Sequence, residues 1–214
     1  MSRSAGRDAR AHVLLATRSE GKLRELLPML EAAGLRGVTL RAAGIVVAPG
    51  EDTIECFDTF EENALAKARW FSARAGGIAV LADDSGLSVD VLGGAPGVRS
   101  KRWAATSGLD GLALDAANNA KLVCELRAAS DRTARYVCVA AVAWPGGEVM
   151  ARGECVGTIL DAPAGTGGFG YDPYFHSAEL GVSFGEASVA AKERVSHRGR
   201  AVRAALMKFA EKIC

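Results

Sequence analysis

Two adjacent carboxylates, Asp83 and Asp84, directly follow the apolar run at residues 78–82 and precede a Ser-Gly pair. The apolar run predicts a buried strand that stops at the two aspartates. Carboxylates at a strand end, followed by a glycine turn, commonly hold Mg²⁺ beside a substrate phosphate, and a neighbouring aspartate can deprotonate a water molecule. The alternative is a polar turn in which Asp83 caps backbone amides. The apolar flanks favour the chemical interpretation, because unpaired carboxylates are costly in such surroundings.

The segment at residues 17–22 lies between a short apolar strand at residues 13–16 and leucines spaced for one face of a helix. A helix N-terminus presents free N–H groups and a partial positive charge, which favour phosphate, and Lys22 adds a full charge. The segment is not a P-loop, because the first glycine is missing and Leu23 follows the lysine. An ordinary capped helix with a surface lysine is the alternative.

A second candidate lysine, Lys67, lies on a predicted helix. Residues 59–62 match a capping box and predict that a helix begins at Thr59. Asn63 and Lys67 are four residues apart and therefore share one helical face. Lys67 is a candidate for contacting a triphosphate, with a solvated lysine as the alternative.

The glycine-rich segment at residues 165–173 includes Phe169 and Tyr171. Glycines allow close approach of a backbone to a ligand, and the two aromatic rings offer faces on which a base can stack. The alternative is a mobile loop between strands. A second glycine-rich segment, residues 93–98, is interpreted as a structural turn, and the basic side chains at positions 99, 101 and 102 as surface charges.

A basic cluster at residues 192–198 leads into the last predicted helix. Positive charge at a helix N-terminus is disfavoured by the helix dipole, so the cluster indicates a bound anion or polar ligand. A plain basic helix start is the alternative.

The bulk properties limit the classes of function. The 214 residues, 49% of them hydrophobic, suit one soluble domain with a sizeable core. The formal net charge of +1 gives no field for nucleic acid or an anionic membrane, and no apolar run approaches the ~20 residues that span a bilayer. The five scattered cysteines contain no CxxC pair and support neither a disulfide framework nor a zinc site, which favours the cytoplasm.

The predicted elements form an α/β fold. Strands alternate with helices, and residues 136–144 and 148–156 predict a β-hairpin around a Pro-Gly-Gly turn. Further helices are predicted at residues 110–128 and 198–213. We therefore expect a central mixed β-sheet with flanking helices, formed by a single domain at residues 12–214 after a disordered tail at residues 1–11.

Taken in order, these segments resemble the inosine-triphosphate pyrophosphatase family. Its members carry a T-x-N-x-x-K loop, an E-N-A-x-x-K-A helix, an A-D-D-S-G-L strand end, a G-x-P-G-V/I-x-S turn, G-G-F-G-Y-D-P and S-H-R. The corresponding segments here are residues 17–22, 62–68, 82–87, 94–100, 167–173 and 196–198. The resemblance covers nearly the whole chain after the first dozen residues.

The resemblance implies two lobes around a deep nucleotide cleft, a homodimer, and Mg²⁺-dependent hydrolysis of ITP, dITP and XTP to the monophosphate and pyrophosphate. It implies Asp84 as the catalytic base, with Lys67 and Asp83 beside it, and Asp84 with Glu55 at the metal. Substrate binding is expected from Thr17, Arg18, Ser19, Glu20, Gly21, Lys22, Asn63, Ser85, Phe169, Gly170, Tyr171, Asp172, Lys192, His197 and Arg198.

This chain departs from the family pattern at several positions. Ser19 replaces the usual Asn of the first loop, so an amide contact is lost or replaced by a hydroxyl. Arg18 is bulkier than the common Gly, and Arg99 and Trp103 stand where Tyr is frequent. Two alternatives remain open at this point. One is a Maf-like pyrophosphatase that acts on other modified nucleotides, and the other is a nucleotide sensor without catalysis.

Overall fold

The computed structural model describes residues 11–104 and 108–213. The predicted disordered tail lies outside these residues except for its last position. The described chain forms one six-stranded sheet in the order β2-β1-β3-β4-β5-β6. The six strands are β1 His12–Leu15, β2 Arg36–Thr39, β3 Ala79–Val89, β4 Thr133–Trp144, β5 Gly147–Ile159 and β6 Phe175–Ser177.

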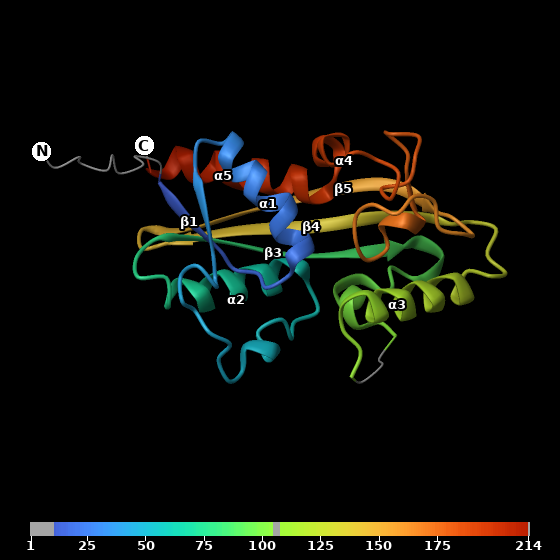
Figure 1. Ribbon diagram of the computed structural model, residues 1–214, viewed down its shortest axis with the longest axis horizontal. Helices are drawn as coiled ribbons and strands as arrows, with labels where there is room; N and C mark the ends of the chain where they lie inside the picture. Colours follow the sequence, from blue (N-terminus) through green and yellow to red (C-terminus); the bar gives the residue numbers. More distant parts are fainter. Residues whose placement is uncertain (1–10, 105–107, 214) are drawn as a thin grey trace, which may run out of the picture.

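The sheet is mixed, as predicted. β1 pairs in parallel with β2 and with β3, whereas β3, β4, β5 and β6 form antiparallel neighbours. The predicted hairpin is confirmed, because β4 and β5 pair from Thr133 with Thr158 to Trp144 with Gly147. The three long strands β3, β4 and β5 run the length of the molecule and connect its two ends (Figure 1).

Helices cover both faces of the sheet (Figure 1). α1 Glu20–Ala32 and α5 His197–Ile213 pack on one face, where apolar side chains such as Leu26, Leu30 and Val202 form a core with β1, β3 and β4. α2 Phe60–Ser72 packs on the other face through Ala64 and Phe71. As predicted, Thr59 caps α2, and its hydroxyl accepts a hydrogen bond from the Glu62 N–H.

A third apolar core lies at the far end of the long strands. There α3 Gly111–Glu125 packs against β3 through Leu122, and Phe175 and Phe184 fill the space beside Tyr136. The short helix α4 Val189–Val195 precedes α5 on the opposite side of the sheet (Figure 1). The molecule therefore has two lobes that share the three long strands.

The prediction that the strand stops at Asp83 and Asp84 is wrong. β3 continues through both residues to Val89, and they pair with Ala140 and Val139 of β4. Successive side chains of a strand point to opposite faces, so each carboxylate meets a different set of neighbours. Each carboxylate has polar or charged partners on its own face. The free-energy cost of burying an unpaired carboxylate, which made the interior of a strand an unexpected place for the two residues, is therefore avoided.

The close approach of α5 to β5 depends on Gly153. A Cβ atom at this position would lie 2.3 Å from the His197 carbonyl oxygen and 2.6 Å from the Ala201 nitrogen, both backbone atoms of α5. We expect Gly153→Ala to lower the free energy of unfolding by about 1–3 kcal/mol, because α5 must shift. Urea unfolding measures this change, with Thr158→Ala on the exposed face of β5 as the control. Equal stability of Gly153→Ala and the parent protein would contradict the close packing.

None of the helices in the described residues combines the length and the apolar character that crossing a bilayer requires.

Candidate active site

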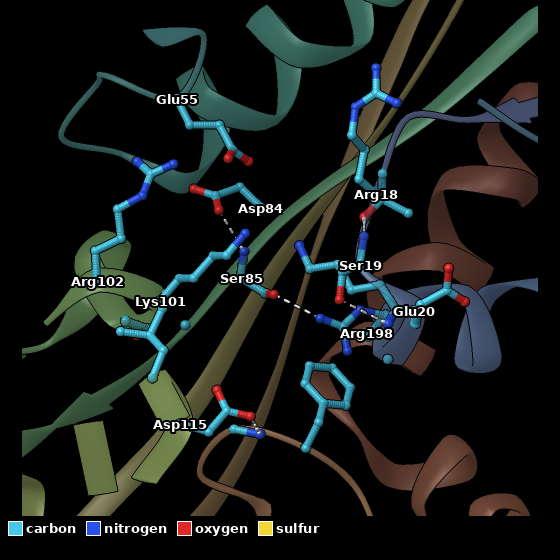
Figure 2. A pocket seen from close by; sticks show the side chains of 18 of the residues that line it. Arg18, Ser19, Glu20, Glu55, Asp84, Ser85, Lys101, Arg102, Asp115 and Arg198 are labelled. Carbon is cyan, nitrogen blue, oxygen red and sulfur yellow. Dashed lines mark hydrogen bonds between the residues drawn. The ribbon is translucent and has the colours of Figure 1, made fainter. Parts of the chain in front are cut away.

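A cavity of about 770 Å³ lies between the two lobes. Its walls come from the β1–α1 loop, the segment before α2, β3, the 3-10 helix Gly97–Arg102, α3, the loop at residues 169–172 and the start of α5. Figure 2 shows charged side chains of these elements pointing toward one another across the space. The single cavity thus joins segments that are up to about 180 residues apart in the chain, since Thr17 and Arg198 both line it.

Asp83 points away from the cavity, toward α1 and α5. Its side chain is 1% exposed, and its Oδ2 atom lies 3.0 Å from both Lys22 Nζ and Arg198 Nε. Burial alone would raise the pKa of Asp83, but the charges of Lys22, Arg198 and Lys67 outweigh it and hold the pKa below its ordinary value. Asp83 is therefore a buried anion that fixes two cations.

Asp84 points to the opposite face and lines the cavity. Its Oδ2 accepts a hydrogen bond of 3.0 Å from the Asn63 amide, and its Oδ1 accepts one of 2.9 Å from the Ser85 N–H. Burial raises the pKa of Asp84 to about 6, although Lys22 and Lys67 oppose the shift, and Glu55 adds to it. A carboxylate with such a pKa is suited to general-base catalysis near neutral pH.

Lys22 and Lys67 meet at the backbone of the aspartate pair. Their Nζ atoms donate to the Asp83 carbonyl oxygen at 3.2 and 2.5 Å. Lys67 also forms an ion pair with Glu55. Both lysines line the cavity beside Asp84, which gives this end of the cavity the cations that a triphosphate requires.

The other end of the cavity has an aromatic wall over buried charges. The Phe169 ring centroid lies 5.2 Å from Lys192 Nζ and 5.6 Å from the Arg198 guanidinium carbon. Gly21 allows this ring to lie against α1, because a Cβ atom there would come within 2.7 Å of it. Lys192 donates to Asp172 Oδ2 at 2.6 Å, and the same oxygen accepts the Phe169 N–H at 2.8 Å. A planar base has a stacking surface and polar partners here.

Two further predicted residues are fixed by packing at this end. The His197 ring stacks on Tyr136 with centroids 4.5 Å apart, and burial followed by the charges of Arg198 and Lys192 lowers the pKa of His197 well below its usual value. The Tyr171 hydroxyl donates to the Ser100 carbonyl at 2.8 Å. The lowered pKa favours a neutral His197 ring at pH 7, and its buried Nδ1 has no hydrogen-bond partner among the residues that the structure describes.

The first loop is held by its own hydroxyls. Ser19 caps α1, because its Oγ accepts a hydrogen bond of 3.3 Å from the Lys22 N–H, and Thr17 Oγ1 accepts the Ser19 N–H at 3.1 Å. Arg18 forms an ion pair with Glu51 at the rim. The serine that replaces the family's asparagine thus takes the role of a helix cap.

Most of the predicted site residues line this one cavity, and two do not. Residues 17–22, Glu55, Lys67, Asp84, Ser85, residues 169–172, Lys192, His197 and Arg198 are all in its walls. Asn63 is only 2% exposed and lies behind Asp84, where it also bonds the Phe57 backbone at 2.9 and 3.2 Å. Asn63 and Asp83, predicted as substrate-binding and catalytic residues, are not among the lining residues and contact Asp84, Lys22 and Arg198, which are.

Several residues in or next to the walls were missed in the sequence. Glu25 forms ion pairs with Lys192 and Arg198, and Asp115 accepts the Gly170 N–H at 2.9 Å. Tyr136, Lys101 and Arg102 also line the cavity. Glu25 and Asp115 are single acids on helices and give no signal in sequence, whereas Lys101 and Arg102, interpreted above as surface charges, line the cavity.

The residues at the phosphate end fit a magnesium ion. Glu55 and Asp84 both line the cavity, and Figure 2 shows their carboxylates on the same side of it. Mg²⁺ is usually held by one or two carboxylates together with waters and substrate phosphates. Among the residues described, no group of three or more His, Cys, Asp or Glu side chains is arranged to hold a metal ion.

Comparisons with known proteins identify the family of the chain. The model of the Ham1 family matches residues 13–208. The chain belongs to the Ham1 family. A Ham1-family structure, the HAM1 protein from Coxiella burnetii, superimposes with a TM-score of 0.78 at 31% identity, covering 94% of this chain and 99% of that one. The resemblance drawn from the six motifs and the α/β fold are thereby confirmed.

Other relatives carry names that state a substrate. A protein of Nocardia farcinica named dITP/XTP pyrophosphatase is 48% identical over 196 residues, which cover 90% of this chain and 92% of the relative. One of Syntrophobacter fumaroxidans with the same name is 46% identical, with 90% and 79% covered. The structure of a nucleoside-triphosphatase / dITP/XTP pyrophosphatase from Mycobacterium abscessus gives a TM-score of 0.67 at 40% identity, with 90% and 97% covered.

Proposed function

We propose that this protein hydrolyses the non-standard purine nucleoside triphosphates ITP, dITP and XTP to the nucleoside monophosphate and pyrophosphate. The observation that carries the proposal is the cavity itself. One end holds Asp84 with Lys22 and Lys67, and the other holds the Phe169 ring above Lys192. This division suits a triphosphate at one end and a base at the other. The names of the relatives, dITP/XTP pyrophosphatase, support dITP and XTP as substrates.

The protein's own groups account for the reaction. Asp84 takes a proton from a water molecule, whose oxygen then attacks the α-phosphorus while the bond to the pyrophosphate oxygen breaks. Asn63 keeps the acceptor oxygens of Asp84 oriented. Lys22 and Lys67 offset the charge that develops on the phosphate oxygens. Asp84 and Glu55 would hold a Mg²⁺ ion, which would supply further positive charge for the phosphate oxygens.

The base end offers an account of selectivity. Hypoxanthine and xanthine carry an acceptor at C6, whereas adenine carries a donor there. Donors from His197, Arg198 or backbone amides satisfy the former and oppose the latter, and an unmatched buried polar group lowers kcat/KM by orders of magnitude. Guanine shares the C6 acceptor, so its rejection has to involve the 2-amino group.

The test is pyrophosphate release from ITP, XTP, dITP, GTP and ATP, with and without Mg²⁺. We expect kcat/KM for ITP and XTP to exceed that for ATP by at least about a hundredfold, and activity to be lost without the metal. Equal hydrolysis of ATP and ITP would contradict the account of selectivity. The same panel, extended to modified pyrimidine and methylated nucleotides, covers the Maf-like alternative, which the comparisons do not support.

We also propose that the protein is a homodimer, as the resemblance implies. β5 carries the exposed apolar side chains Met150 and Val156, which offer a surface for a second copy. Light scattering during size-exclusion chromatography is expected to give a mass near twice that of the 22.2 kDa chain.

The expected compartment is the cytoplasm. Cys56, Cys124, Cys138 and Cys155 are free thiols, and Cys138 and Cys155 are buried, which suits a reducing environment.

A further inference from the structure

We propose that Asp115 and Asn119 of α3 are positioning residues that hold the base loop, residues 169–172, in place and so determine how tightly the protein binds the base of its substrate. Both side chains act through the backbone of Gly170 in that loop. The inference rests on the proposed function and extends it to the helix that supports the base end of the cavity.

Both backbone polar groups of Gly170 are bonded to α3. The Gly170 N–H donates to Asp115 Oδ2 at 2.9 Å, and the Gly170 carbonyl oxygen accepts a hydrogen bond of 3.0 Å from the Asn119 side-chain amide. Asp115 and Asn119 are four residues apart and therefore share one face of the helix. Figure 2 shows the Asp115 side chain directed at the loop beside the cavity. We call these two hydrogen bonds the α3 clamp.

Gly170 needs such a clamp because of its own backbone conformation. Its φ of +63° lies in the left-handed region, which glycine adopts without strain. A Cβ atom at this position would meet no atom within 4 Å, so the conformation and not a lack of space favours glycine here. A glycine has many conformations open to it, and the two hydrogen bonds from α3 select one of them.

The neighbours of Gly170 in the loop are the residues that form the base end. Phe169 comes directly before it, and its ring centroid lies 5.2 Å from Lys192 Nζ. Asp172 comes two positions after it and accepts hydrogen bonds from Lys192 and from the Phe169 N–H. A displacement of about 1 Å at a site can change its activity greatly. The position of Gly170 therefore decides where the stacking ring and the buried carboxylate meet a base.

α3 itself is fixed by contacts that do not involve the base loop. Asn118 accepts the Ala104 N–H at 2.8 Å and donates to the Lys101 carbonyl at 3.0 Å. Leu122, one turn further along, is fully buried in the third apolar core. The clamp thus joins a glycine-rich loop to a helix whose position is already set, which lowers the entropy that the loop loses when a ligand binds.

The loop stays attached to the fold without the clamp. The Tyr171 hydroxyl donates to the Ser100 carbonyl at 2.8 Å, and the Gly185 N–H donates to the Asp172 carbonyl at 3.1 Å. We therefore expect variants of Asp115 to fold and to differ from the parent protein mainly in the position and motion of the loop.

The test compares Asp115→Ala and Asn119→Ala with Asp115→Asn, whose side-chain oxygen can still accept the Gly170 N–H. The kinetic readout is kcat and KM for ITP. Calorimetric titration with IMP, and separately with Mg²⁺-pyrophosphate, measures binding without turnover, and amide hydrogen exchange measures the protection of residues 169–172 without any nucleotide. The control is Glu125→Ala, which removes an exposed acid at the end of α3, outside the cavity walls.

We expect each alanine variant to raise KM for ITP and Kd for IMP about tenfold, because the clamp serves the binding of the base. kcat should change less than about threefold and the affinity for pyrophosphate should stay the same, since the reacting phosphorus lies at the other end of the cavity. Amide exchange in the base loop should become faster. Asp115→Asn should retain most of the IMP affinity, and Glu125→Ala should behave as the parent protein.

Unchanged IMP affinity in both alanine variants, or equal weakening of IMP and pyrophosphate binding, would overturn the inference. An Asp115→Asn variant as impaired as Asp115→Ala would overturn it as well, because the acceptor oxygen would then not be what matters. If the parent protein does not hydrolyse ITP, the proposed function fails, and the exchange of the base loop still decides whether the clamp holds it.

Discussion

Replacing Asp84 with asparagine is expected to lower kcat for ITP by about 10²–10⁴-fold, the range that a positioned general base contributes. The amide has nearly the same shape as the carboxylate and keeps acceptor capacity toward the Ser85 N–H. It cannot take a proton from water, and it removes one of the two carboxylates that we propose as ligands of Mg²⁺. Initial rates of pyrophosphate release at saturating ITP measure the change.

The fold should tolerate this substitution. Asp84 is not part of the ion pairs that join Asp83 to Lys22 and Arg198. The urea midpoint of Asp84→Asn is therefore expected to stay close to that of the parent protein. Glu125→Gln, an exposed neutralisation at the end of α3, controls for the loss of one negative charge. Near-normal turnover by Asp84→Asn would rule out its role as the base.

Asp83→Ala, unlike Asp84→Asn, is expected to cause a large loss of stability. The alanine leaves Lys22 and Arg198 without their shared buried anion. Removing one partner of a buried ion pair typically lowers the free energy of unfolding by about 3–5 kcal/mol. Urea unfolding at pH 7 measures this effect, and activity is expected to fall because Arg198 and Lys22 both line the cavity.

The pH dependence of this contribution has a definite sign. The pKa of Asp83 is lowered in the folded protein relative to the ordinary value of about 3.9. Its stabilisation is therefore fully present at neutral pH and is lost only as the pH falls below about 4. The stability difference between Asp83→Ala and the parent should shrink in that acidic range. If Asp83→Ala were as stable as the parent protein at pH 7, the ion pairs of Asp83 with Lys22 and Arg198 would not contribute to the stability of the fold.

The hairpin and the start of α2 could be predicted because their signals are local. A Pro-Gly-Gly turn between two alternating runs and a Thr59 cap depend on a few neighbouring residues. The end of β3 could not be predicted in this way. The Asp83-Asp84 pair looks like a strand terminus until the cations and amides that the two faces supply from α1, α2 and α5 are known.

The same limit applies to the site. The motifs identify Lys22, Lys67 and Asp84, because each belongs to a dense local pattern. The roles of Asn63 and Asp83 as supports depend on which way a side chain points, and this follows from packing. Lys101 and Arg102 were interpreted as surface charges, since only the contact of their 3-10 helix with Gly86 and Asn118 turns them toward the cavity.

The most direct test of the central claim is the position of the bond that breaks. Hydrolysis of ITP in water enriched in ¹⁸O, followed by mass spectrometry of the products, identifies the phosphorus that water attacks. Attack at the α-phosphorus beside Asp84 predicts IMP and pyrophosphate in equal amounts, with the label in IMP alone. Label in pyrophosphate, or formation of IDP and phosphate, would contradict the assignment of the cavity and of Asp84.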